Sequence, residues 1–492
     1  MPLSQLENAL TYDVRTFLTS HFSSDTIRKG SFISSLITCV VDASVVTFSI
    51  FTPQFIRYLH YDQIDINIIA AAMNIGLYLT LPALGYLSDA HGPILLALIG
   101  MVLCPGYLLA AYCYLSNSGY LLMSLAFFLI GTGTSSAYFC SLLTCAKIYS
   151  DRKGLSISLP VTCYGLSSLL LSYVFDLSIF RIDGEISIYK VFIFLSIIYL
   201  ITGLLNSVSS VVVTIEKEVV FSKLIEEEIE AEREEYEEDE DRINGSFGRA
   251  AARVQSYASV DEATSLINSE FLEPQTHEAR FKRFLRDPTM PLLYIGLFFL
   301  AGTQELFISN LGSLTETVGK VHEQNEISSQ VALFSVFSTI ARLSVGFLTD
   351  LFGTCRATLT MILMTVALCV VAYSLIAINY QEFAIVTGLM GLCYGSTFTL
   401  FPTLVAMVWG VDLMGSTWGL FLSAPAIGDL IFGLFYAYQY DSYCEVGKEL
   451  NLGAYCLTFS FTSFTVLCLV SGVCLLYCYR RYWKATDRVS QT

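Results

Sequence analysis

Four ionisable side chains lie inside long apolar stretches of this sequence, where a charged group is costly. They are Asp42, Glu305, Arg342 and Asp429. At the centre of a lipid bilayer each charge costs about 2.5–3.5 kcal/mol on insertion scales, so each needs a water-filled cavity or a partner. A carboxyl group in such surroundings can take up and release a proton at neutral pH. Proton exchange inside a membrane is therefore the chemistry that these residue types indicate.

The depth of each group separates the four candidates. Counting about 1.5 Å per helical residue from the ends rich in Lys and Arg puts Glu305 at ~22 Å, Asp429 at ~20 Å, Asp42 at ~16 Å and Arg342 at ~9 Å. Glu305 and Arg342 are thus a poor ion pair, and we expect Arg342 to snorkel to the surface in a structural role. Glu305 is our candidate for proton coupling. For Asp42 and Asp429, structural and functional roles remain equally open.

The elements that must hold these groups are membrane-spanning helices. The chain has 492 residues, of which 54% are hydrophobic and 14% charged, a composition that no soluble core requires. Runs of about 20 apolar residues are long enough to cross a bilayer. We predict an all-α membrane protein with twelve transmembrane helices in two six-helix halves. The predicted spans are Ser31–Phe51, Ile68–Leu87, Ile94–Leu115, Tyr120–Leu142, Leu155–Phe175, Tyr189–Val213, Met290–Leu311, Ser328–Leu348, Ala357–Ile378, Phe383–Val405, Ser416–Tyr436 and Leu457–Tyr479.

An acidic run separates the two halves. Residues 214–287 hold 20 Asp and Glu against 10 Lys and Arg, so they carry 10 of the 16 net negative charges. Low hydropathy and high charge predict disorder for this loop. The expected organisation is therefore an N-terminal segment 1–30, a first half 31–213, the acidic loop 214–287, a second half 288–479 and a tail 480–492.

The distribution of Lys and Arg predicts the orientation. Loops on the cytosolic side of a membrane are enriched in these residues. One set of loops holds few of them, so both termini and the acidic loop are expected in the cytosol. The other, basic set contains Arg28, Lys29, Lys147, Arg152, Lys153, Arg280, Lys282, Arg283, Arg286, Arg356, Arg480, Arg481, Lys484 and Arg488.

A short motif, G-x-L-x-D-x-x-G, occurs after the second and the eighth predicted span. Its first glycine permits close helix packing, and its aspartate can face the positive end of a helix. Two copies at matching places indicate duplicated halves, which is typical of transporters. The second copy is followed by one basic residue, Arg356, whereas Pro93 and Ile94 follow the first. The motif residues are Gly85, Asp89 and Gly92 in the first copy and Gly346, Asp350 and Gly353 in the second.

On this motif the sequence resembles the major facilitator superfamily, and on further segments its nodulin-like fungal members named as monocarboxylate transporter homologues. This resemblance implies the twelve-helix fold and a vacuolar membrane location. In contrast to animal monocarboxylate carriers, the first span has Asp42 instead of a basic residue. The further segments are Met73-Asn74-Ile-Gly76, Ser156-Ile-Ser158-Leu-Pro160, Asn310-Leu-Gly312-Ser313 and Ala424-Pro425-Ala-Ile-Gly428.

Two features of the loops yield further expectations. Glu262, Leu266 and Ile267 fit the acidic dileucine pattern that sorting adaptors bind, although short patterns recur by chance. Cys444 and Cys456 are the cysteines assigned to loops on the non-cytosolic side. Oxidation is permitted there, so we predict a disulfide between them, with two free thiols as the alternative.

Three classes of function compete. The first is a secondary transporter that moves a small solute by alternating access, with protons as coupling ion. The second is a membrane sensor or scaffold that kept the fold without transport. An embedded enzyme is disfavoured, because all five His lie outside the spans and the spacing shows neither a catalytic triad nor metal ligands. We expect a monomer in the bilayer that uses no cofactor, metal or nucleic acid.

Overall fold

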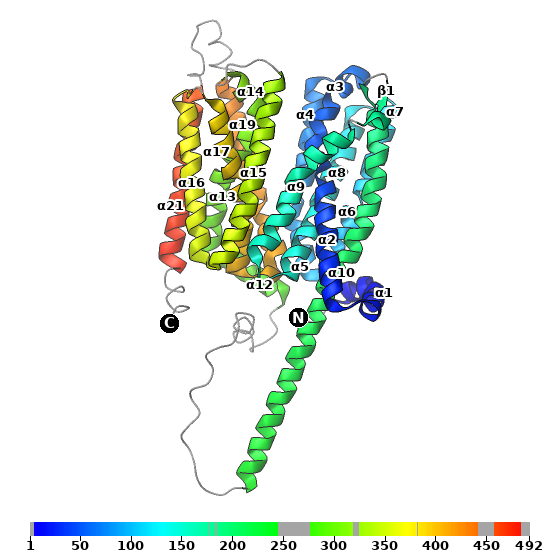
Figure 1. Ribbon diagram of the computed structural model, residues 1–492, viewed down its shortest axis with the longest axis vertical. Helices are drawn as coiled ribbons and strands as arrows, with labels where there is room; N and C mark the ends of the chain where they lie inside the picture. The colour runs from blue at the N-terminus through cyan, green and yellow to red at the C-terminus, as the bar shows by residue number, and fades with distance from the viewer. Residues whose placement is uncertain are drawn as a thin grey trace.

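The structure is a computed structural model that describes residues 4–175, 177–182, 185–244, 276–317, 324–380, 382–440 and 457–483. Over these residues the chain is helical apart from its turns and one small hairpin. In that hairpin β1 (Arg181–Ile182) pairs antiparallel with β2 (Glu185–Ile186). Two helical bundles stand side by side (Figure 1). The predicted all-α architecture is confirmed.

The first bundle contains the N-terminal helices. Its second span is interrupted by a π-helical segment, η2, and its first by a 3-10 segment, η1. The elements are α2 (Ser24–Asp42), η1 (Ala43–Thr47), α3 (Phe48–Leu59), α4 (Gln63–Asn74), η2 (Ile75–Leu79), α5 (Leu81–His91), α6 (Ile94–Gly100), α7 (Leu103–Leu115), α8 (Tyr120–Ile148), α9 (Lys153–Phe175), η3 (Ser178–Phe180) and α10 (Ile188–Asn244).

The second bundle contains the C-terminal helices. Its eleventh predicted span is broken before Pro425, which removes a backbone donor and favours such a break. The elements are α13 (Thr289–Ser309), α14 (Leu311–Thr317), α15 (Gln324–Phe352), α16 (Cys355–Ala377), α17 (Phe383–Trp409), η4 (Val411–Leu413), α18 (Met414–Phe421), α19 (Ser423–Gln439), α21 (Thr458–Cys478) and η7 (Tyr479–Trp483).

Two short helices, α1 (Gln5–His21) and α12 (His277–Arg286), lie at one end of the molecule. The C-terminal end of α21 lies at the same end (Figure 1), which requires an even number of crossings. The residues of the basic loops, such as Lys147 and Arg356, follow or precede spans at this end. We call it the basic end.

The number of candidate spans is close to the prediction. Among the described residues, ten helices are long and apolar enough to cross a membrane, or eleven if the bent pair of α2 and α3 counts as one span. The remaining predicted span, the fifth (Leu155–Phe175), corresponds to α9, which is 23 residues long. It packs in the interior, against α2 of the first half and α15 and α17 of the second.

The acidic segment differs from the prediction at both of its ends. The sixth span does not stop at Val213, because α10 continues as one helix of 57 residues to Asn244. Glu, Lys and Arg are good helix formers, so a charged run can prolong a helix that is already nucleated. At the other end, α12 is helical because Phe281 and Phe284 pack against the bundle. Charge pattern alone did not reveal either helix.

The buried core shows where the halves meet. One cluster of buried apolar residues includes most of the second half together with residues of α5, α6, α8 and α9, among them Leu84 and Ile157. A second cluster, around Phe55 and Phe192, belongs to the first half alone. The first-half members of the shared cluster lie toward the basic end. The two halves therefore share a core at the basic end.

Candidate functional site

The first contact between the halves, which we call the first seam, joins α5 to α18. Gly85 lies so close to the second half that a Cβ atom there would be 2.0 Å from the carbonyl oxygen of Gly415. A Cβ at Gly415 would in turn lie 2.7 Å from the carbonyl oxygen of Gly85. Only glycine at both positions allows the two backbones to touch.

Asp89 closes the first seam electrostatically. Its carboxylate accepts hydrogen bonds from the backbone amides of Gly415 (3.2 Å) and Ser416 (2.6 Å), in the first turn of α18. Lys147 of α8 lies 3.3 Å from the same carboxylate, and the Asp89 side chain is fully buried. A negative charge at the N-terminus of a helix is favourable. Gly92, with φ of 85°, then turns the chain in a conformation that favours glycine.

The second seam repeats this arrangement between α15 and α9. Asp350 accepts hydrogen bonds from the amides of Gly154 (2.6 Å) and Leu155 (2.8 Å), at the start of α9. A Cβ on Gly346 would lie 2.2 Å from the hydroxyl of Ser158. Gly353 has φ of 58°. Each motif copy thus binds the N-terminal turn of a helix in the opposite half.

The basic partners of the two copies differ from expectation. The first copy, which lacks basic residues after Gly92, obtains a cation from Lys147 on another helix. Arg356, the base that follows the second copy, is exposed and makes no ion pair with Asp350 among the described residues. The sequence neighbourhood of the motif did not predict this, because the cation comes from a distant part of the chain.

Between the seams and the far end lies a polar group that we call the central cluster: Glu305, Arg342, Tyr394, Tyr164 and Tyr138. Tyr394 of α17 donates a hydrogen bond to Glu305 of α13 (3.1 Å). The guanidinium of Arg342, on α15, lies 5.8 Å from the centre of the Tyr394 ring. Glu305 is partly buried as a residue, and its carboxyl group is held by the Tyr394 hydroxyl.

Arg342 does not snorkel as predicted. Its exposure is 7%, and it points across the interface, where it donates a 2.7 Å hydrogen bond to the carbonyl oxygen of Val161 on α9. A Cβ on Gly165 would lie 2.1 Å from the same guanidinium, so this glycine makes room for it. The Nε atom of Arg342 is buried and has no hydrogen-bond partner among the described residues. The prediction that Arg342 does not pair with Glu305 agrees with the geometry.

Asp429 lies on α19, the helix that packs directly on α13. The two helices approach so closely that a Cβ on Gly302 would be 2.7 Å from the Cα of Gly428. Asp429 interacts electrostatically with Glu305 and with the hydroxyl of Ser309. The structure therefore brings Glu305, Arg342 and Asp429 into one region of the second half.

Asp42 lies apart from the other three, in the first half. It ends α2, where the helix changes to the 3-10 segment η1. Its exposure is 0%, and neither carboxylate oxygen has a hydrogen-bond partner among the described residues. Tyr164 is within electrostatic range of Asp42, Glu305 and Arg342, so it connects the two sets.

Sequence reasoning missed the tyrosines. The rings of Tyr138 and Tyr164 pack in a tilted arrangement, with 4.4 Å between ring centres, on the first-half side of the central cluster. Tyr78, in the π-helical segment η2, interacts electrostatically with Glu305 from the opposite half. Such π-helical segments are frequent at functional sites. With 29 Tyr in the chain, only the three-dimensional arrangement singles these out.

Two sets of predicted residues lie outside the described part of the chain. They are the sorting motif, Glu262, Leu266 and Ile267, and the cysteine pair, Cys444 and Cys456. Both predictions remain open.

Known proteins resemble this chain over most of its length. The family model described as Major Facilitator Superfamily matches residues 34–433. A protein named Probable transporter MCH1 from Wickerhamomyces anomalus is 38% identical over 92% of this chain and 88% of its own length. Its namesake from Debaryomyces hansenii is 36% identical over 97% of both chains. The resemblance noted from the sequence motifs is confirmed.

A solved structure supports the fold. The proton:xylose symporter XylE, bound to 6-bromo-6-deoxy-D-glucose, superimposes with a TM-score of 0.60 at 10% identity. The match covers 93% of this chain and 95% of the symporter. At this identity the likeness concerns the fold alone.

Proposed function

We propose, from the premise that the chain belongs to the Major Facilitator Superfamily, that it is a proton-coupled secondary transporter of a small solute. The names of its relatives and the family support a transporter. Proton coupling at Glu305 is the finer part of the proposal. The single observation that carries it is the hydrogen bond, within the second half, from Tyr394 to a partly buried Glu305.

Glu305 has the surroundings that proton exchange requires. Its neighbour Asp429 is a second acid, and two nearby carboxylates disfavour simultaneous ionisation. The Tyr394 hydroxyl can donate to the ionised form and can still hydrogen-bond the neutral form. Tyr78 approaches from the opposite half. A proton on Glu305 thus changes the charge at a point where the halves meet.

The two seams are the proposed gate at the basic end. Both seams are closed in this structure, each by an aspartate on the first turn of a helix in the opposite half. Alternating access requires these contacts to form and break as a solute site changes the side to which it opens. Because both seams join the same two halves, a rocking motion of one half against the other breaks both.

Arg342 supplies a clue to the solute. Its buried Nε, which has no hydrogen-bond partner in the described part of the chain, is a donor that a bound solute can satisfy. A carboxylate or another oxygen-rich acceptor fits this donor. We therefore propose a small solute with an anionic or strongly accepting group.

The proposed location is the vacuolar membrane, with the basic end and both termini in the cytosol. Lys and Arg at the basic end support this orientation, and the resemblance to nodulin-like fungal members supports the compartment. Glu262, Leu266 and Ile267 are the proposed sorting signal.

Flux measurements on the full chain in sealed proteoliposomes test the function. We expect uptake of at least one member of a panel of small organic anions, and its accumulation when a pH gradient is imposed. Exchange without accumulation would show that the chain is a transporter but that transport is not coupled to protons. Binding of a solute with no flux would indicate the sensor instead.

A further inference from the structure

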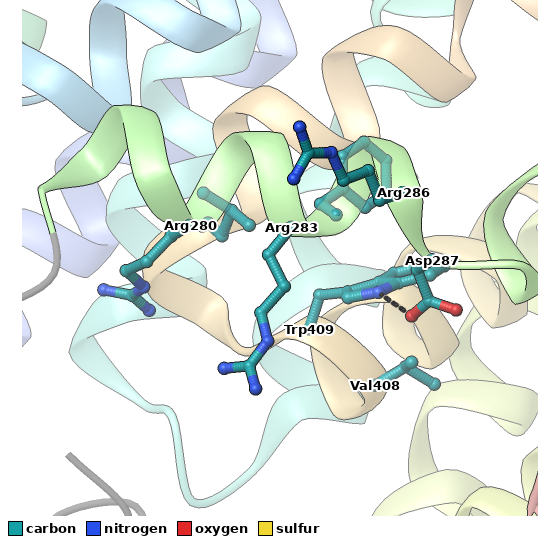
Figure 2. A pocket seen from close by; sticks show the side chains of 8 residues that line it. Arg280, Arg283, Arg286, Asp287, Val408 and Trp409 are labelled. Atoms are coloured by element: carbon teal, nitrogen blue, oxygen red, sulfur yellow. Dashed lines mark hydrogen bonds between the residues drawn. The ribbon is translucent and has the colours of Figure 1, made fainter.

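A pocket at the basic end is lined by three arginines and is separate from the central cluster. Its volume is about 510 Å³, within the range of small-molecule sites. Figure 2 shows Arg280 and Arg283 extending from α12 on the side where Trp409 and Val408 lie, with Arg286 at the end of the helix. The remaining lining residues are Phe284, Asp287 and Leu413.

The floor of the pocket is rigid and apolar. Phe284 is 2% exposed and packs edge-on against Trp409, with 5.0 Å between ring centres. Both rings also contact Phe421 of α18. The arginine side chains are therefore presented above a fixed aromatic surface.

The single acid in the lining is already engaged. One Asp287 oxygen accepts from the backbone amide and hydroxyl of Thr289, at 2.8 and 2.7 Å. The other accepts from the indole N–H of Trp409 at 2.9 Å, the dashed line in Figure 2. These three donors place Asp287 at the start of α13, so its role is to anchor that helix.

The lining therefore carries three arginine side chains against the single carboxylate of Asp287, so its net charge is positive. Lys282, on the same helix, pairs with Glu278. Within the described residues neither Arg283 nor Arg286 forms an ion pair, and both are exposed. Planar guanidinium groups bind phosphate oxygens with two parallel hydrogen bonds. Clusters of basic residues beside a membrane span also attract anionic lipid head groups.

We propose that this pocket binds a phosphate-bearing anion at Arg283, which extends on the side of Trp409, with Arg286 at the rim as a second cation. The phosphate belongs either to an anionic lipid head group at the basic end or to a soluble phosphate compound.

The pocket adjoins the first seam. His277 of α12 lies 3.4 Å from the Ser416 hydroxyl and 4.7 Å, between ring centres, from Tyr86 of α5. Leu413, a lining residue, belongs to η4, the segment directly before α18. An anion that holds α12 against η4 therefore favours the closed first seam.

The test uses the purified full chain in detergent, titrated in separate arms with inorganic phosphate, sodium chloride at matched ionic strength, short-chain phosphatidylinositol 4-phosphate and short-chain phosphatidylcholine. Tryptophan fluorescence reports binding, and the thermal midpoint reports stabilisation. We expect saturable binding in one or both phosphate arms and none with chloride. Tighter binding of the phosphoinositide than of inorganic phosphate identifies a lipid head group, and equal affinity identifies a soluble phosphate.

Single substitutions locate the site. Arg283→Gln and Arg286→Gln should each weaken binding about fivefold, the effect of about 1 kcal/mol per basic side chain near an anionic surface. Lys282→Gln, on the same helix but outside the pocket, is the matched control and should bind as the wild type does. If neither phosphate arm saturates in the wild-type chain, or if Lys282→Gln weakens binding as much as the arginine variants, the proposal is overturned. The wild-type arms decide the question even if a variant fails to fold.

Discussion

The two seams look alike in sequence but differ in how they balance charge. In the first seam, Asp89 is fully buried and has both helix amides and Lys147 as partners. In the second, Asp350 has only the amides of Gly154 and Leu155 among the described residues. The difference teaches that a repeated motif preserves the helix-capping contact, whereas the compensating cation can come from elsewhere in the fold. It also predicts that the two seams respond unequally to substitution.

The largest inequality is expected when the aspartates are neutralised. Asp89→Asn leaves Lys147 buried without its partner, a loss of about 3–5 kcal/mol for a buried pair. Asp350→Asn weakens two amide hydrogen bonds and should cost about 1–3 kcal/mol. Hydrogen–deuterium exchange measures the effect directly, because the hydrogen-bond donors are backbone amides. Exchange should rise at Gly415 and Ser416 in Asp89→Asn, and at Gly154 and Leu155 in Asp350→Asn. Equal increases in exchange at both sites would remove the distinction.

The next largest difference between the seams is expected from substitutions that add a methyl group at the two close glycine contacts. Gly85→Ala drives a Cβ into the Gly415 carbonyl, which belongs to the backbone and cannot rotate away. At Gly346 the nearest atom is the Ser158 hydroxyl, so Gly346→Ala is the milder change. Overpacking costs about 1–3 kcal/mol, and we expect Gly85→Ala at the upper end by thermal denaturation. Ser158→Gly should partly restore Gly346→Ala; no recovery would show that the second seam is equally rigid.

The cations provide a smaller test. Lys147→Gln removes the charge that faces Asp89, yet Asp89 retains two amide donors, so a loss of about 1–2 kcal/mol is expected. Arg356→Gln serves as the matched control, since this exposed side chain should contribute less than about 0.5 kcal/mol. Thermal midpoints of the two variants give the comparison. A larger loss for Arg356→Gln would show that the basic residue next to the second motif copy, and not Lys147, is the more important cation.

The smallest effect is a pH dependence confined to the first seam. Burial lowers the pKa of His277, which faces Asp89 and His91 of α5, Lys147 of α8 and Arg280 of its own helix. A histidine whose pKa is lower in the folded state stabilises the fold above its unfolded value, about 6.5, and loses this contribution as the pH falls. The thermal midpoint should therefore drop between about pH 7.5 and about pH 5.5. In His277→Gln the drop should be smaller, and an unchanged drop would exclude His277 as its source.

Much of the fold could be predicted from the sequence, because apolar length and the duplicated motif are local signals. Gly85 and Gly346 marked the close helix contacts, and the aspartates marked helix-end contacts. What the sequence could not provide was the partner: Lys147 is 58 residues from Asp89, and nothing local connects them. The same holds for Arg342, whose depth suggested the surface and whose actual partner, Val161, is in the other half.

Only some residues of the central cluster could be predicted from the sequence, for a related reason. A charged residue in an apolar span stands out, so the sequence pointed to two members of the cluster, Glu305 and Arg342. A tyrosine in such a span does not, although Tyr394 is the residue that orients Glu305. The extension of α10 and the helix α12 were missed because charge patterns predict solvation and do not report whether a helix continues or packs.

Replacing Glu305 by Gln is the most direct test of proton coupling. The amide imitates the protonated carboxyl group in shape and still accepts a hydrogen bond from Tyr394, but it cannot lose a proton. In sealed proteoliposomes the Glu305→Gln chain should exchange solute across the membrane as the wild type does, while accumulation in response to a pH gradient is abolished. If the Glu305→Gln chain still concentrates solute when a pH gradient is imposed, Glu305 does not couple transport to protons.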